Sequence, residues 1–397
     1  MLSPSDIQSV IHDITDIYSQ VESECISAIV KRLNAGSKVM ETSVWQMRKM
    51  SEAGALSRDL VRRLSNVLPM TEKQIIDVLT ASLKQSRYTD LKTAKKVSAQ
   101  LKIDGVVDVS AEGFQRVLRS ASAGIHDILN MTGTQAIQAS VRTYTDAINN
   151  AYLRTISGNY TLEDSVRKAT GAIGKSGIKI VEKKEQIVDT ELLNTNGELQ
   201  TTYMSTQGLR TYPLDSAIRR DIVTSINRAC GELTLADGDL LETDLVLTSW
   251  HIGARPEHEA WQGKVFTRNP NDKRYPNFYD VCGYGEVDGI CGINCRHSFM
   301  PYFEGTSINL DNKPTAEENN RIYDLLQQQR GFERNLRAMK RQQVAFREGG
   351  HMEDAKRIQS RINSYSQSYR NFLDQNNLVR ESMLERVEGY RPIGTKK

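Results

Sequence analysis

Residues 249–266, SWHIGARPEHEAWQGKVF, and residues 279–303, YDVCGYGEVDGICGINCRHSFMPYF, decide the fold class of this chain. With the polar loop between them they contain three of its six histidines, three of its five cysteines and two of its three tryptophans. The segments on either side are long, polar and helical in pattern. The sequence therefore predicts one small mixed module between helical arms.

Two strands and a short helix are expected inside this module. Residues 244–250, DLVLTSW, are typical of a buried strand, and residues 295–303 are expected to pair with it. Pro256 suits the first position of a helix that Gly263 would stop. The fold class expected for the whole chain is α+β, predominantly α.

Long helices are predicted upstream, where apolar residues recur every three or four positions. The first covers residues 7–33. A second is expected over residues 43–68, where Pro69 would stop it, and a third would open at Thr71. These helices make up an extended N-terminal region.

The N-terminal region continues with one more long helix. Residues 110–157 predict a helix that would span roughly 70 Å if Thr132-Gly133 did not kink or divide it. Thr161 is a capping residue for a shorter helix. The glycine- and lysine-rich residues 171–186 are typical of a connector or short hairpin. Further on, a proline at 213 is expected to open the helix that carries Ile218, Ile222 and Ile226.

The C-terminal part has a regular heptad pattern that predicts an antiparallel helical hairpin. The pattern breaks at residues 347–350, Arg-Glu-Gly-Gly. The residues at its apolar positions are Ile322, Leu325, Gln329, Phe332, Leu336, Met339, Gln343 and Phe346, then Ala355, Ile358, Ile362, Tyr365, Tyr369 and Phe372. Residues 315–397 contain 16 basic and 11 acidic side chains, an excess typical of a solvated face or of a face that contacts DNA phosphates or an acidic partner.

These patterns divide the chain into four regions. They are a helical N-terminal region (1–160), a connector with a short helix or hairpin (161–212), a small α+β module (213–305), and a C-terminal helical hairpin with a basic tail (306–397).

Composition excludes several classes of protein. The chain has 397 residues, of which 39% are hydrophobic and 25% charged. These fractions are typical of extended helical proteins, which expose a large surface per residue. A net charge of +3 is too balanced for a dedicated nucleic-acid coat. No run approaches the roughly 18 apolar residues of a membrane helix, and the first residues lack a signal-peptide layout. We expect cytoplasmic synthesis, no membrane partner, and reduced cysteines, because their number is odd.

The histidines and cysteines of the module allow two chemical interpretations. Zinc binding would use Cys282, Cys291, Cys295 and His297, with His251 and His258 upstream, although their spacing fits no common zinc module. Nucleophilic catalysis would use Cys295 as thiolate, His258 or His251 as base, and Asn294 or Glu259 to orient it. Because of that spacing we expect no metal and no cofactor, and cysteines that are small buried apolar residues. Because no nucleophile signature surrounds Cys295, we also expect no enzyme activity.

A third interpretation is architectural: polar side chains tie irregular turns into a rigid unit. Arg255 and Arg296 have forked donors that suit carboxylates or backbone carbonyls. Glycines supply the turns that other residues would strain. They stand at positions 283, 285, 289 and 292.

The motifs of the module resemble those of a known family. H-x-G-A-R-P-x-H-x-x-W-Q-G-K-V-F at 251–266, G-Y-G at 283–285 and G-I-C-G-I-N-C-R-H at 289–297 are similar to the phage minor capsid protein 2 family, itself related in layout to Mu F-like head morphogenesis proteins. The residues that match are His251, Gly253, Arg255, His258, Trp261, Gln262, Gly263, Gly283, Tyr284, Gly285, Gly292, Asn294, Cys295, Arg296, His297 and Pro301.

The resemblance implies a structural protein of a tailed phage or prophage, made in the bacterial cytoplasm and placed in the virion near the portal, inside the head. Its implied partners are the portal protein and the major capsid protein, with packaged DNA as a further contact of the basic hairpin. The resemblance implies no catalytic role for the matching residues. The alternative is a Cys/His-dependent enzyme or a zinc-stapled effector module carried in the virion.

Overall fold

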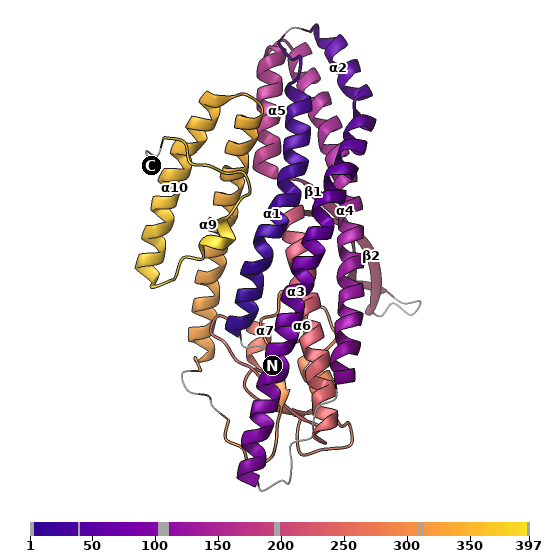
Figure 1. Cartoon of the computed structure of the whole chain (residues 1–397), viewed down its shortest axis with the longest axis vertical. Coiled ribbons are helices and arrows are strands. Elements are labelled where there is room, and N and C mark those ends of the chain that lie inside the picture. The colour runs from indigo at the N-terminus through magenta and orange to yellow at the C-terminus, as the bar shows by residue number, and fades with distance from the viewer. Residues whose placement is uncertain are drawn as a thin grey trace.

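Long helices lie side by side in an elongated molecule (Figure 1). The computed structural model describes residues 4–38, 40–101, 111–193, 199–308, 310 and 313–394. The N-terminal elements are α1 (Pro4–Asn34), α2 (Thr42–Ser51), α3 (Ala53–Leu101), α4 (Ala111–Ile156), α5 (Leu162–Ser176), the antiparallel hairpin β1 (Lys179–Leu193) and β2 (Leu199–Pro213), and α6 (Leu214–Leu240). The hairpin lies on the side of the molecule opposite α10, the last long helix (Figure 1).

The largest core lies where α1, α3, α4, α5 and α6 face one another. The predicted apolar spacing of α1 is confirmed, because Val21, Cys25, Ile29 and Leu33 are all buried there. Pro213 comes directly before α6, as predicted, and the isoleucines of that helix join the same core. The capping prediction for α5 is also confirmed, since Thr161 accepts a hydrogen bond from the backbone N–H of residue 164 at 3.1 Å.

The predicted helix boundary at Pro69 is wrong. The chain breaks at Glu52 instead, and α3 continues through Pro69, so no helix opens at Thr71. Proline cannot donate to the carbonyl four residues earlier, but Pro69 is exposed, where water can solvate that carbonyl. The buried stripe of α3 runs through the proline from Leu64 to Ile75. Burial of that stripe outweighs the local cost of about 3 kcal/mol.

The possible division of α4 at Thr132-Gly133 is not found, since α4 runs unbroken from Ala111 to Ile156. Residue 110, where the helix was expected to begin, lies outside the described residues. Gly133 packs against α3, where a Cβ would lie 2.9 Å from Leu68 Cδ1. This glycine allows two helices to approach each other and does not bend its own.

The mixed module follows α6 and sits at one end of the molecule (Figure 1). Its elements are β3 (Leu245–Thr248), α7 (Pro256–Glu259), β4 (Val265–Thr267), α8 (Phe278–Cys282) and β5 (Phe299–Pro301). The sheet has the order β4-β3-β5 and is antiparallel throughout. The predicted pairing of β3 with the closing strand and the predicted fold class, α+β and predominantly α, are confirmed.

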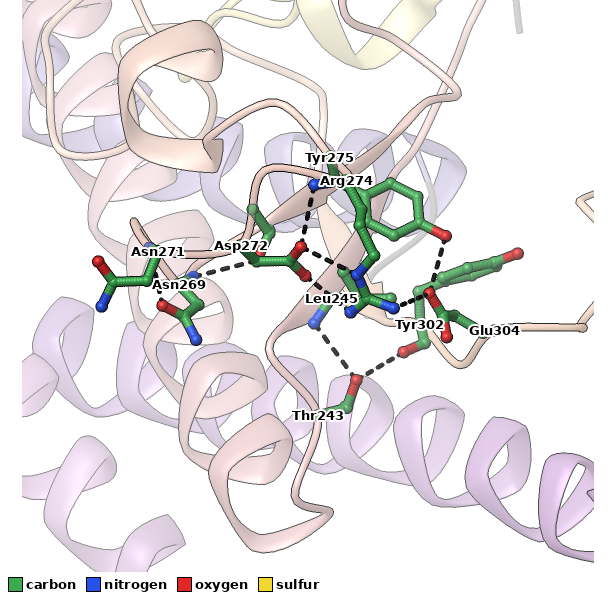
Figure 2. A network of polar contacts seen from close by, with 10 residues as sticks. Thr243, Leu245, Asn269, Asn271, Asp272, Arg274, Tyr275, Tyr302 and Glu304 are labelled. Carbon is green, nitrogen blue, oxygen red and sulfur yellow. Dashed lines mark hydrogen bonds and ion pairs between the residues drawn. The ribbon is translucent and has the colours of Figure 1, made fainter.

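One ion pair and one hydrogen bond hold the polar loop between β4 and α8 against the segment that follows β5 (Figure 2). Arg274 pairs with Asp272 at 2.9 Å and with Glu304 at 2.8 Å. Tyr275 donates its hydroxyl hydrogen to the same Glu304 carboxylate at 3.2 Å. This loop is therefore an ordered part of the module.

The predicted C-terminal hairpin is confirmed as α9 (Ala316–Glu348) and α10 (Met352–Asn376), which share their own apolar core. After a 3-10 turn (Ser382–Glu385) the chain returns along α9, where Gln343 Nε2 donates to the carbonyl of Arg391 at 2.8 Å. The far side of α9 contacts α5 through Gly171 and Gly174, which bring the two helices together. Among the described residues, no helix is both long and apolar enough to cross a bilayer.

Candidate functional site

Short elements of the mixed module bring its histidines and one cysteine together. β3 ends three residues before His251, and α7 carries His258 two residues after Pro256. The irregular chain after α8 then delivers Cys295 and His297 directly before β5. Side chains up to 46 positions apart in the sequence therefore face one another.

Three of these side chains place reactive atoms in one small space. His258 Nδ1 lies 3.4 Å from His297 Nδ1. Cys295 Sγ lies 3.9 Å from Nδ1 of His258 and 3.6 Å from Nδ1 of His297. His258 exposes only 3% of its surface, Cys295 4% and His297 1%. They form a buried group, here called the His-Cys-His group.

Hydrogen bonds on the far side of each ring set its tautomer. His258 Nε2 lies 2.7 Å from the carbonyl oxygen of Asp288. His297 Nε2 lies 3.1 Å from Gln262 Oε1, which is the amide oxygen because it also accepts the backbone N–H of His251 at 3.2 Å. Carbonyl oxygens only accept, so both Nε2 atoms carry the proton. Both Nδ1 atoms therefore turn lone pairs toward Cys295.

Aromatic contacts hold the rings in place. The His251 ring packs against the His297 ring, tilted by 33°, with ring centroids 4.3 Å apart. Trp261 packs against both rings of the group, at 4.8 Å from His258 and 4.6 Å from His297. Few other rotamers are open to side chains packed in this way.

Burial determines the charge of these groups. It lowers the pKa of His251 to about 4 and also lowers the pKa values of His258 and His297. It raises the pKa of the Cys295 thiol to about 11. At neutral pH the imidazoles are therefore uncharged and the thiol keeps its proton.

The protonated state of the Cys295 thiol argues against its use as a nucleophile. Cys295 lies next to His258 and His297, whereas His251 contacts the back of the His297 ring. A catalytic cysteine needs a thiolate, and burial here opposes it. Glu259 points to Lys313 at 3.9 Å. Two imidazole nitrogens therefore lie close to the Cys295 sulfur, but burial disfavours the thiolate that they would have to generate.

The turn that leads to Cys295 is strained. Cys291 and Asn294 adopt left-handed backbone angles, φ of 59° and 55°. Such angles are uncommon outside glycine and tend to occur at functional sites. Gly289 is required in the same turn, because a Cβ there would lie 1.8 Å from the carbonyl oxygen of Gly283. The turn thus holds an unfavourable conformation that places Cys295 beside the histidines.

A cavity of about 360 Å³ opens beside the His-Cys-His group, between the module, α6 and α9. Its other wall is rich in arginine, from α6, the module and α9. Burial and the neighbouring Arg296 lower the pKa of Arg330 to about 10, and burial raises the pKa of Glu333 to about 7. The arginines that line it are Arg219, Arg255, Arg296, Arg330, Arg334 and Arg337.

The remaining residues of the matched motif take structural positions around this group. Arg255 donates to the carbonyl of Ile293 at 2.7 Å. Gly253 and Gly263 have positive φ and lie against Leu326 and Leu310 in turn. Gly283 ends α8 in a left-handed conformation, and the Tyr284 ring packs with two phenylalanines. Gly285 faces open space, Gly292 lies against backbone carbonyls, and Pro301 is in β5.

Two asparagines from outside the motif also reach the site, and no sequence pattern predicted them. Asn227 of α6 donates to the carbonyls of Cys295 and His297, both at 3.3 Å. Asn319 of α9 exchanges two hydrogen bonds of 2.9 Å with the backbone of Ala254. An isolated asparagine on a helix gives no sequence signal for such contacts. The structure also groups His258, and neither Cys282 nor Cys291, with Cys295 and His297.

Comparison with known proteins identifies the family. The model of the family named phage minor capsid protein 2 matches residues 2–190 and 195–374. A structural protein of Lactococcus phage LL-H is 27% identical over 95% of this chain and 96% of its own length. A structural protein of Lactococcus phage mv4 is 33% identical over 27% of this chain and 85% of its own length. No solved structure matches. This chain therefore belongs to the phage minor capsid protein 2 family.

Proposed function

We propose that the protein is a non-enzymatic component of the phage head that docks on the portal protein, inside the capsid, through the free tip of its N-terminal helices. Membership of a minor capsid family supports a place in the virion. The two relatives, both named structural proteins, support a role without catalysis. Adjoining major capsid subunits would flank the same docking site.

The observation that carries this proposal is a group of exposed apolar side chains at the tip, on α2 and the end of α4, here called the tip patch. Its four members are Val44, Met47, Leu153 and Ile156, which expose between 50% and 66% of their surface. The two helices are joined there, since Gln46 Nε2 donates to Asn149 Oδ1 at 3.3 Å. The tip is the end farthest from the mixed module (Figure 1). Apolar groups clustered on an otherwise polar surface mark protein contacts.

Co-expression of the full chain with the portal protein of the same phage tests the docking proposal. The double substitution Met47→Glu and Leu153→Glu places charges in the tip patch, so it should abolish co-purification without a change in melting temperature. The matched control is Val379→Glu, which changes an 81% exposed apolar residue outside the tip. Undiminished co-purification of the tip variant would remove the basis of the proposal.

A second candidate contact is packaged DNA, through the solvent face of α10. Many basic side chains of α9 are already used inside the molecule: Arg337 pairs with Asp215 at 3.3 Å and Arg341 with Glu22 at 3.3 Å. On α10 the side chains of Arg361 and Arg370 are exposed, whereas the exposed Lys356 and Arg357 pair with Glu353 and Asp354. Contact with phosphates would release counterions, so the affinity should fall steeply with salt.

A salt series with duplex DNA tests this second contact. The double substitution Arg361→Gln and Arg370→Gln should reduce the slope of log affinity against log salt concentration by about one for each phosphate contact that is lost. The control is Arg321→Gln, an exposed residue at the start of α9. Binding that stays flat from low to high salt would contradict the contact.

A further inference from the structure

The His-Cys-His group has the dimensions of a metal site. A tetrahedral zinc ion with bonds of about 2.0 Å to nitrogen and about 2.3 Å to sulfur separates two nitrogens by about 3.3 Å, and nitrogen from sulfur by about 3.5 Å. The group shows 3.4 Å between its nitrogens, and 3.6 Å and 3.9 Å between sulfur and nitrogen. All three separations thus lie within about 0.4 Å of those that one tetrahedral ion would impose.

The tautomers of the two histidines point to the same conclusion. Both Nδ1 atoms direct lone pairs inward, because both Nε2 protons are donated outward, to the Asp288 carbonyl and to Gln262 Oε1. Histidines that bind a metal typically donate their other N–H to a carbonyl or carboxylate in this way. Asp288 and Gln262 thus stand where the outer partners of metal ligands stand.

A purely hydrogen-bonded group would leave these lone pairs unsatisfied. The Cys295 thiol has one proton, which can serve only one of the two imidazoles. The other Nδ1 would then lie buried, 3.4 Å from a second lone pair, with no donor among the described residues. A buried acceptor without a partner costs about as much as a lost hydrogen bond, and two facing lone pairs repel each other. A cation between the three atoms removes both problems.

We propose that His258, Cys295 and His297 bind a zinc ion through Nδ1, Sγ and Nδ1. Imidazole and thiolate are both ligands that zinc accepts, and among the described residues no methionine, the usual axial ligand of a copper site with the same three ligands, lines the adjoining cavity. The three ligands also line the arginine-rich cavity, so water or a small anion from that cavity would complete the tetrahedron. On binding, the Cys295 thiol releases its proton to solvent and a zinc–thiolate bond forms.

The ion would fasten two parts of the module that otherwise meet only through side-chain packing and hydrogen bonds. His258 belongs to α7, whereas Cys295 and His297 follow the strained turn that includes Cys291 and Asn294. A metal bond to the residue after the turn compensates for the unfavourable backbone angles before it. The inference is independent of portal docking, which uses the opposite end of the molecule.

Metal analysis of the full chain, purified without a histidine tag, is the primary test. Elemental analysis should find about one zinc ion per chain. A strong chelator should remove it and lower the melting temperature, and added Zn²⁺ should restore both. Replacement by Co²⁺ should give the absorption of a tetrahedral site with a thiolate-to-cobalt band. A chain without bound metal, whose melting temperature responds to neither chelator nor Zn²⁺, would overturn the proposal, and so would a stoichiometric metal other than zinc.

Matched cysteine variants test the assignment of the ligands. Cys295→Ser should lose the thiolate-to-cobalt band and bind Zn²⁺ at least tenfold more weakly. Cys282→Ser changes a cysteine that is equally buried but lies outside the group, so it should keep the band. His258→Gln provides a second variant if Cys295→Ser fails to fold, and it should lose zinc while keeping its circular dichroism. Retention of the full band in Cys295→Ser would refute the site.

Discussion

Gly174→Ala tests how the C-terminal hairpin is held against the N-terminal helices. A Cβ at this position of α5 would lie 2.7 Å from both Ala345 Cβ and Gln342 Cα, and 2.9 Å from the carbonyl oxygen of Arg341. Carbon atoms pack best at about 3.5 to 4.0 Å. Because two of these three atoms belong to the backbone of α9, the helices must separate by about 1 Å to admit one methyl group.

The free energy of unfolding should fall by about 1 to 3 kcal/mol. Overpacking of a close interface costs about 1 to 3 kcal/mol. Separation of the helices also stretches the 3.0 Å hydrogen bond that Gln342 Nε2 donates to the carbonyl of Gly171. Loss of such a hydrogen bond costs about 0.5 to 1.5 kcal/mol. The higher helix propensity of alanine offsets about 1 kcal/mol of this loss. The steric terms therefore exceed the propensity term.

Thermal and denaturant unfolding of two glycine variants provide the assay. Gly124→Ala is the matched control, since Gly124 is exposed in α4 and no atom lies within 4 Å of its added Cβ. That variant should gain about 0.5 to 1 kcal/mol from propensity alone. The two substitutions should thus act in opposite directions. If Gly174→Ala were as stable as the wild type or more so, the proposed close contact of α5 and α9 would be wrong.

Three further substitutions test other parts of the structure by unfolding measurements. Pro69→Ala should raise the free energy of unfolding by about 1 to 3 kcal/mol, because it restores a helix hydrogen bond; a loss would mean that α3 ends at the proline. Asp237→Asn should stabilise the protein by about 1 to 3 kcal/mol at pH 8 and have little effect at pH 4. Burial raises the pKa of Asp237 from 3.8 to about 7, so the carboxyl contributes its full stability below pH 3.8 and loses it as the pH rises through 7; equal effects at both pH values would contradict this. Asn319→Leu should cost about 1 to 3 kcal/mol and speed hydrogen exchange at the Ala254 amide, because both backbone groups of Ala254 lose their partners; unchanged exchange would argue against the contact.

Local sequence patterns predicted most of the helices and the small sheet. The apolar spacing of α9 and α10, the glycine break between them and the strand before Trp250 all depend on neighbours within a few positions. Such patterns are visible because helices and strands repeat every 3.6 and 2 residues. The motif around His258 and Cys295 was also visible, and the family match confirms the resemblance it carries.

The course of α3 through Pro69 and the make-up of the His-Cys-His group were decided by the tertiary structure. Proline is a local stop signal, but the packing of residues on both sides of it against α1 and α4 gives more free energy than the lost hydrogen bond costs. Cys282, Cys291 and Cys295 look alike in the sequence, yet only Cys295 lies beside His258 and His297. Which ligands meet depends on how a strained turn and a short helix pack together, and that packing joins side chains whose separation along the chain follows no period.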